Sequence, residues 1–127
     1  MLHRFGFGLF ALMFALIAAC SRGPDMADPP PQQWGNVSVK IETRPLPPRA
    51  GMNEFLVIGT DARGKPAWNM MVMLRTDTND GWRQAIQDGE SGVFRKALPL
   101  ESGPQNLFVK LQRRGEEAVL EFPLQVE

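Results

Sequence analysis

The chain has 127 residues and carries 14 Lys and Arg against 14 Asp and Glu, with one His and one Cys. This balance gives no basic field that would attract nucleic acid, and a single cysteine excludes an internal disulfide. The length suits one domain, whose stability must come from a hydrophobic core.

The first element in chain order is an apolar segment behind a basic start. His3 and Arg4 precede a run of apolar and small residues from 5 to 19. This run is shorter than the roughly 20 residues that a helix needs to cross a bilayer. A basic start, a short apolar run and a small-residue exit predict a cleaved secretory signal peptide, residues 1–19. A short membrane anchor and a buried core helix are the alternatives.

The single cysteine follows this segment directly. Leu16-Ile17-Ala18-Ala19-Cys20 resembles the lipobox of bacterial lipoproteins, with an aliphatic residue three positions before the Cys. The resemblance implies that the Cys20 thiol receives a diacylglyceryl group and that cleavage makes Cys20 the first residue. Its new amino group would then be acylated with a fatty acid such as palmitate. Several acyl chains anchor a protein stably, whereas one holds it only marginally. An unmodified thiol beside an ordinary signal-peptidase site is the alternative.

Ser21 bears on the location of the protein. By the same resemblance, Asp at this position retains Gram-negative lipoproteins in the inner membrane, whereas Ser leaves the outer membrane as the default. We therefore expect a lipid-anchored protein of the cell envelope, on the outer membrane and facing the periplasm. In a Gram-positive source the anchor is the plasma membrane. The expected partners are membrane lipid, bound through acylated Cys20, and another envelope protein.

Residues 20–33 are polar and proline-rich behind the lipidated Cys20. Pro29-Pro30-Pro31 favours an extended polyproline conformation, which holds a domain away from a membrane. We therefore expect a tether over residues 20–33 and a folded domain over residues 34–127.

Beyond Trp34, apolar and polar residues alternate with a period of two, as in Val37, Val39 and Ile41. Such segments, bounded by Gly- and Pro-rich turns, predict seven strands: residues 37–42, 53–60, 70–76, 82–87, 93–98, 107–112 and 118–126. Short strands at this spacing, with no helical pattern, predict a single all-β, immunoglobulin-like β-sandwich, and a closed barrel is the alternative. Pro123 lies on the polar face of the last strand, which indicates a strand at a sheet edge.

Two stretches of this domain resemble a known family. NEFLVIGTDARGKP (residues 53–66) and SGVFRKALPLESGPQNLFVKLQRRGEEAVLEFPLQV (residues 91–126) are similar to the FixH and YtkA-like group of small envelope domains. Members of that group are often linked to copper handling or to the assembly of copper oxidases. FixH-like members usually carry a transmembrane helix where this chain has a lipobox, so their location is not carried over.

Methionines are the candidate ligands for such a copper function. Thioether sulfur suits Cu(I), and Met52, Met70, Met71 and Met73 fall in or beside predicted strands. Cu(I) bound by these four residues is therefore the alternative reading of the domain. Methionine is also a common filler of irregular core gaps, and packing is the simpler interpretation.

No catalytic residues can be assigned. Removal of residues 1–19 takes away the only His, His3, and no serine lies in a Gly-x-Ser-x-Gly elbow. Trp34, Trp68 and Trp82 are either core anchors or an exposed face for a partner protein. The sequence therefore predicts a membrane-anchored envelope lipoprotein whose β-sandwich is a non-enzymatic interaction or structural domain.

Overall fold

The computed structural model describes residues 28–77 and 81–127. The predicted signal peptide and Cys20 lie outside these ranges. Within them, no helix is long and apolar enough to cross a membrane.

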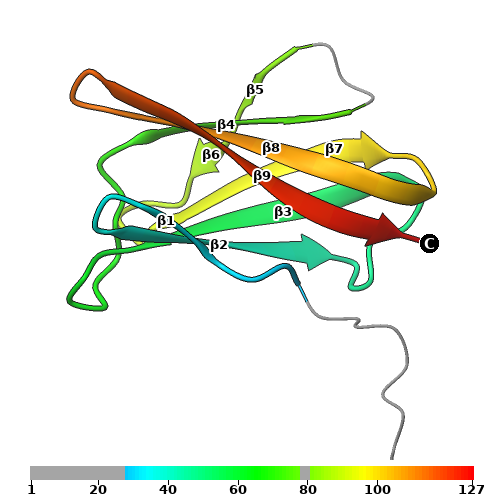
Figure 1. Cartoon of the computed structure of the whole chain (residues 1–127), viewed down its shortest axis with the longest axis horizontal. Helices are drawn as coiled ribbons and strands as arrows, with labels where there is room; N and C mark the ends of the chain where they lie inside the picture. Colours follow the sequence, from blue (N-terminus) through cyan, green and yellow to red (C-terminus); the bar gives the residue numbers. More distant parts are fainter. Residues whose placement is uncertain (1–27, 78–80) are drawn as a thin grey trace, which may run out of the picture.

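Two antiparallel sheets make up the described chain (Figure 1). One sheet has the strand order β1-β2-β3-β7-β6, and the other has the order β5-β4-β8-β9. The strands are β1 Gln32–Trp34, β2 Val37–Arg44, β3 Gly51–Thr60, β4 Met71–Thr76, β5 Arg83–Gln84, β6 Ile86–Gln87, β7 Val93–Leu100, β8 Gly103–Arg113 and β9 Glu116–Val126. The order β2-β3-β7-β6 opposite β4-β8-β9 is that of an immunoglobulin-like sandwich, so the predicted all-β fold is confirmed.

The described residues form two more strands than the sequence predicted. β1 begins at Gln32, inside the segment predicted as a tether, and pairs with β2. The predicted strand 82–87 is divided at Ala85: β5 pairs with β4 in one sheet, whereas β6 pairs with β7 in the other. Ala85 is buried and its N–H donates to the carbonyl of Val72 over 2.9 Å. A small buried residue thus lets the chain pass from one sheet edge to the other.

The core fills the space between the two sheets. Alternate residues of the longer strands, such as β2 and β4, face inward, as a half-buried sheet requires, and the largest fully buried side chains include Phe55, Phe94 and Phe122. These three come from β3, β7 and β9, so both sheets contribute an aromatic ring to one continuous cluster.

β9 forms an edge of the four-stranded sheet, as Pro123 predicted. Backbone N–H and C=O groups point to alternate sides along a strand. On the side of β9 away from β8, the Glu121 carbonyl accepts a hydrogen bond from the side-chain amide of Gln32 over 2.6 Å. The Glu127 N–H donates to the Pro48 carbonyl over 2.9 Å on the same side. Pro123 has the same parity and offers no N–H, so this edge lacks a donor to another strand at that position.

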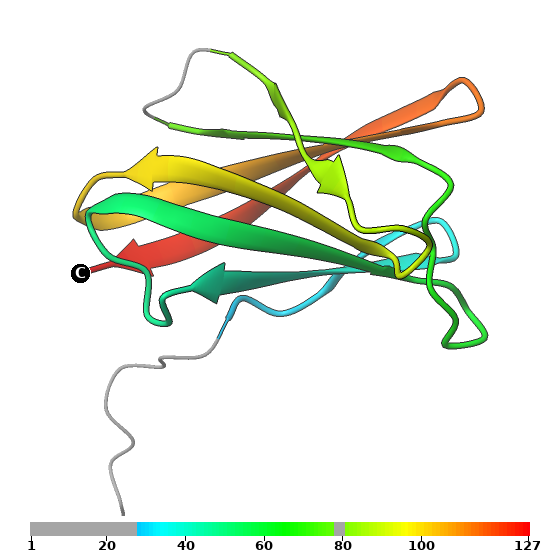
Figure 2. The same cartoon turned by 180° about the vertical axis from the view of Figure 1, so that it is seen from behind.

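The chain upstream of β1 also lies on the sandwich. The Asp28 carboxylate accepts the Thr43 N–H over 3.0 Å, and Oγ1 of Thr43 lies 3.3 Å from the same oxygen. Thr43 is close to the end of β2, so the chain joins the domain there and runs antiparallel to β2 toward Trp34. Figures 1 and 2 show this segment beside the lower edge of the sandwich.

Candidate functional site

A groove crosses one end of the sandwich, beside the start of β4. It consists of three adjoining hollows of about 300, 420 and 350 Å³, and Met71 lines all three. Hollows of this size are typical of sites for small molecules and short peptide segments. We refer to these three hollows together as the Met71 groove.

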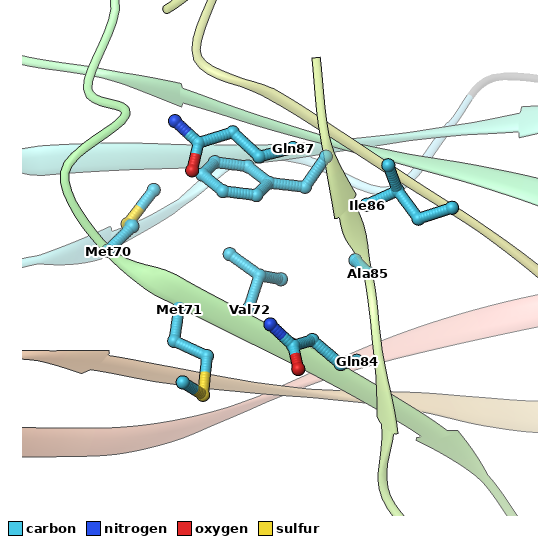
Figure 3. Close-up of a pocket in the computed structure, with 8 residues that line it drawn as sticks. Met70, Met71, Val72, Gln84, Ala85, Ile86 and Gln87 are labelled. Atoms are coloured by element: carbon cyan, nitrogen blue, oxygen red, sulfur yellow. The ribbon is translucent and has the colours of Figure 1, made fainter. Parts of the chain in front are cut away.

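The first hollow exists because the chain changes sheets at Ala85. After β5 leaves β4, the edges of the two sheets separate, and Val72 and Phe94 form an apolar floor between them. Gln84 and Gln87 stand on either side of Ala85 along the wall, as Figure 3 shows. The crossover therefore shapes the hollow directly.

The second hollow has a cationic and amide-rich lining. Arg113 and Arg114 contribute two guanidinium groups, and no carboxylate lines this hollow. Its amide side chains are Asn69, Gln84, Gln87 and Gln112. The carboxylates of the groove, Glu116 and Glu117, lie in the third hollow.

One of these two carboxylates is already engaged. Glu117 accepts the Gln112 Nε2 over 3.1 Å and lies 4.0 Å from Lys110 Nζ. Arg113 is held from the other side, because its guanidinium lies 5.3 Å from the centre of the half-buried Trp34 ring. Arg113 and Arg114 line the third hollow as well, so the cationic side chains of the groove adjoin its carboxylates there.

Exposed apolar side chains gather at this groove. The large apolar side chains that the structure leaves exposed are Leu46, Met52, Trp68, Met71, Ile86 and Val119. Three of these six, Trp68, Met71 and Ile86, line the groove, and Ile86 is 72% exposed. Exposed apolar side chains that cluster on a solvent-facing surface mark a contact site more often than scattered ones do.

A rigid turn before Trp68 supports one wall. The Asp61 carboxylate accepts the N–H groups of Arg63 and Lys65, each over 2.9 Å. These backbone hydrogen bonds, chiefly that of Lys65, lower the pKa of Asp61, because they stabilise the charged carboxylate. The turn then returns to β3, where the Ala67 N–H donates to the Gly59 carbonyl over 2.9 Å.

The four methionines predicted as copper ligands lie in different places. Met52 is 66% exposed near the start of β3, whereas Met70 packs beside Gly59 near the end of the same strand. Met71 and Met73 alternate on the outer face of β4. In Figure 3 the side chains of Met70 and Met71 extend to opposite sides of the chain. The structure thus brings Met70 and Met71 to one groove and leaves Met52 apart, so it does not gather the four predicted ligands in one place.

The tryptophans also divide between packing and exposure. Trp34 packs against the core, and the half-buried Trp82 lies 5.1 Å from the Arg75 guanidinium and 4.6 Å from Lys110 Nζ. Trp68 alone of the three is classed with the exposed large side chains. Among residues 28–77 and 81–127, no group of three or more His, Cys, Asp or Glu side chains is arranged to hold a metal ion.

Comparison with known proteins adds no family to this description. Neither the protein-family models nor the curated proteins give a match for this chain.

Sequence reasoning missed the polar wall of the groove. Gln84 and Gln87 fall in the predicted strand 82–87, and Arg113 falls in the turn between the last two predicted strands. Their convergence depends on the change of sheet at Ala85, which the sequence did not predict. The structure gives Arg114 and Gly115 of the β8–β9 turn φ of 51° and 78°, a conformation that favours Asn-Gly. Arginine is therefore not the residue type that this turn favours.

Proposed function

We propose that this chain is a lipid-anchored protein of the bacterial cell envelope and that its β-sandwich is a non-enzymatic interaction domain. The Met71 groove supports the proposal of an interaction domain. It combines Trp68, Met71 and Ile86 with two arginines, and Trp, Met and Arg are residue types enriched where proteins contact partners. The described residues of the groove include no His, Ser or Cys that would act as nucleophile or base.

The lipid anchor is supported by the residues around Cys20. The lipobox-like stretch Leu16 to Cys20 follows a short apolar segment, and Ser21 favours the outer membrane in a Gram-negative source. Seven residues, 21 to 27, separate the acylated cysteine from Asp28. At about 3.3–3.6 Å per residue, that segment reaches far enough to hold the sandwich clear of the headgroups.

Membrane fractionation of a Cys20→Ala variant tests the anchor. We expect the variant to leave the membrane fraction or to accumulate as the unprocessed precursor, because it lacks the acylated sulfur. A Ser21→Asp variant is the matched control: it keeps Cys20 and should stay membrane-bound, but move to the inner membrane of a Gram-negative host. Mature, membrane-bound Cys20→Ala protein would refute the proposal.

A further inference from the structure

We propose that the Met71 groove binds an extended acidic and apolar peptide segment of a partner protein. In this complex, Arg113 and Arg114 contact carboxylates of the peptide, while Trp68, Met71 and Ile86 contact its apolar side chains. The inference rests on the proposed interaction function and names the ligand class of that same site.

Charge complementarity selects the acidic character of the peptide. The second hollow presents two guanidinium groups without a carboxylate in its lining. Arginine binds carboxylates through two parallel hydrogen bonds, which fix both distance and orientation. The Arg113 guanidinium lies 5.3 Å from the centre of the Trp34 ring, and this contact restricts the side chain before any ligand binds.

The exposed apolar residues select a peptide over a saccharide. A sugar ring stacks on an aromatic face such as that of Trp68, but Ile86 and Met71 offer no comparable face. These two side chains, 72% and 43% exposed, gain from contact with apolar side chains, which a peptide supplies. Methionine is moreover a flexible side chain that adapts to varied apolar partners.

The amides of the groove match a peptide backbone. Each Asn or Gln amide both donates and accepts, as do the N–H and C=O groups of an extended chain. The side-chain amides of Asn69 and Gln84 have no hydrogen-bond partner among the groups described in residues 28–77 and 81–127. They are free to pair with backbone groups of a ligand in the second hollow.

The turn at Arg114 gives an independent argument. Arg114 is exposed and adopts φ of 51°, where Asn or Gly is favoured, so folding alone does not select arginine at this position. The residue lies at the tip of the β8–β9 hairpin and lines the second and third hollows. A cation held at the groove at a conformational cost is consistent with a contact to a ligand.

The position of the groove keeps it accessible on an anchored protein. The described chain begins at Asp28, which contacts Thr43, and Thr43 pairs with Phe55 in the middle of β3. The groove lies farther along the sandwich, beyond the Gly59 end of β3, where Figures 1 and 2 show the start of β4 and the β8–β9 hairpin. Attachment through Cys20 therefore leaves the groove open to a partner in the envelope.

Binding of synthetic probes to the full chain, purified in its processed form and placed in lipid nanodiscs, tests the proposal. The probe is a short fluorescent peptide in which Glu and Leu alternate, followed by fluorescence anisotropy with empty nanodiscs as the blank. A peptide with Lys in place of Glu and soluble disaccharide-peptide fragments of peptidoglycan are the competing probes. A photoreactive leucine in the peptide identifies the residues that it contacts.

We expect the Glu-Leu peptide to bind and to crosslink at Trp68, Met71 or Ile86. Arg114→Asn should weaken binding about tenfold, the effect of one charge-assisted hydrogen bond, while leaving the free energy of unfolding equal or higher, since Asn suits the turn. The exposed Arg49, in the loop at the opposite end, supplies the control: Arg49→Asn removes the same charge and should leave binding unchanged.

Three results would overturn the inference: equal binding of the Lys-Leu peptide, equal binding by the Arg114→Asn and unaltered proteins, or crosslinks outside the groove. Binding of the peptidoglycan fragments at the groove in place of the peptide would also overturn it, while leaving the interaction function intact. Failure of the proposed lipid anchor is a separate result, read from the Cys20→Ala fractionation.

Discussion

Gly92 provides the sharpest test of how this sandwich is built. It is buried at the start of β7 with φ of 77°, and a Cβ there would lie 2.6 Å from the Gly59 carbonyl oxygen and 3.1 Å from the Pro66 Cβ. The same Gly59 oxygen accepts the Ala67 N–H over 2.9 Å. Gly92→Ala must therefore displace backbone that holds the turn before Trp68.

The magnitude follows from three contributions. An L-residue in the left-handed region costs about 1–2 kcal/mol, crowding against packed atoms about 1–3 kcal/mol, and a weakened hydrogen bond about 1 kcal/mol. Gly64 isolates the first of these, because its φ is 78° and a Cβ there would meet nothing within 4 Å. We therefore expect Gly92→Ala to lower the free energy of unfolding by about 2–4 kcal/mol more than Gly64→Ala does.

Urea unfolding followed by tryptophan fluorescence measures this difference, since Trp34, Trp68 and Trp82 report from three parts of the fold. The two variants share the conformational cost, so only the contact at Gly59 separates them. Equal free energies of unfolding would refute the close approach of β3, β7 and the turn.

Three further predictions concern single side chains. Gln105→Met should raise the free energy of unfolding by about 1 kcal/mol, because the buried Gln105 Oε1 has no hydrogen-bond partner among the described residues. Chemical unfolding measures the change, with Gln125→Met at an exposed site of β9 as the control, and a lower free energy of unfolding would contradict the prediction. Because the folded pKa of Asp61 is lower than its unfolded pKa, the charged carboxylate stabilises the fold above the unfolded value, and this stability is lost as the pH falls through the folded value. Asp61→Asn should therefore flatten the dependence of the free energy of unfolding on pH below about 4. The same pH dependence in the variant and the unaltered protein would contradict the role of Asp61 in the turn. Titration with Cu(I) should show no saturable site that depends on Met52, Met70, Met71 and Met73 together. A Cu(I) site in the unaltered protein that disappears in Met52→Leu would instead support the copper-handling alternative.

The regular part of the fold could be predicted because one face of each strand is buried. Alternation at Val37, Val39 and Ile41 fixes which residues face the core, and a shift of one residue would expose them all. Pro123 predicted the edge position of β9 because a missing N–H is tolerated there. These signals are local in the sequence, so no knowledge of neighbouring strands was needed.

The division at Ala85 could not be predicted in the same way. Residues 82–87 read as one strand, and only the competition between β4 and β7 for pairing decides where the chain changes sheets. β1 was missed because Gln32 and Gln33 carry no apolar pattern. Their pairing depends on the backbone edge of β2 that β3 leaves open. The groove depends on that same change of sheet, so its glutamines were missed for one physical reason.

The groove and the core are coupled through the turn at residues 61–67. Trp68 follows Ala67, whose N–H is fixed to Gly59, and Gly59 in turn donates to the Gly92 carbonyl over 2.8 Å. A side chain at Gly92 would thus shift the wall of the groove without touching any residue that lines it. Gly92→Ala should weaken binding of the Glu-Leu peptide even under conditions where the variant stays folded, whereas Gly64→Ala should leave this binding unchanged. Unaltered binding in the folded Gly92→Ala protein would show that Trp68 is positioned by other contacts.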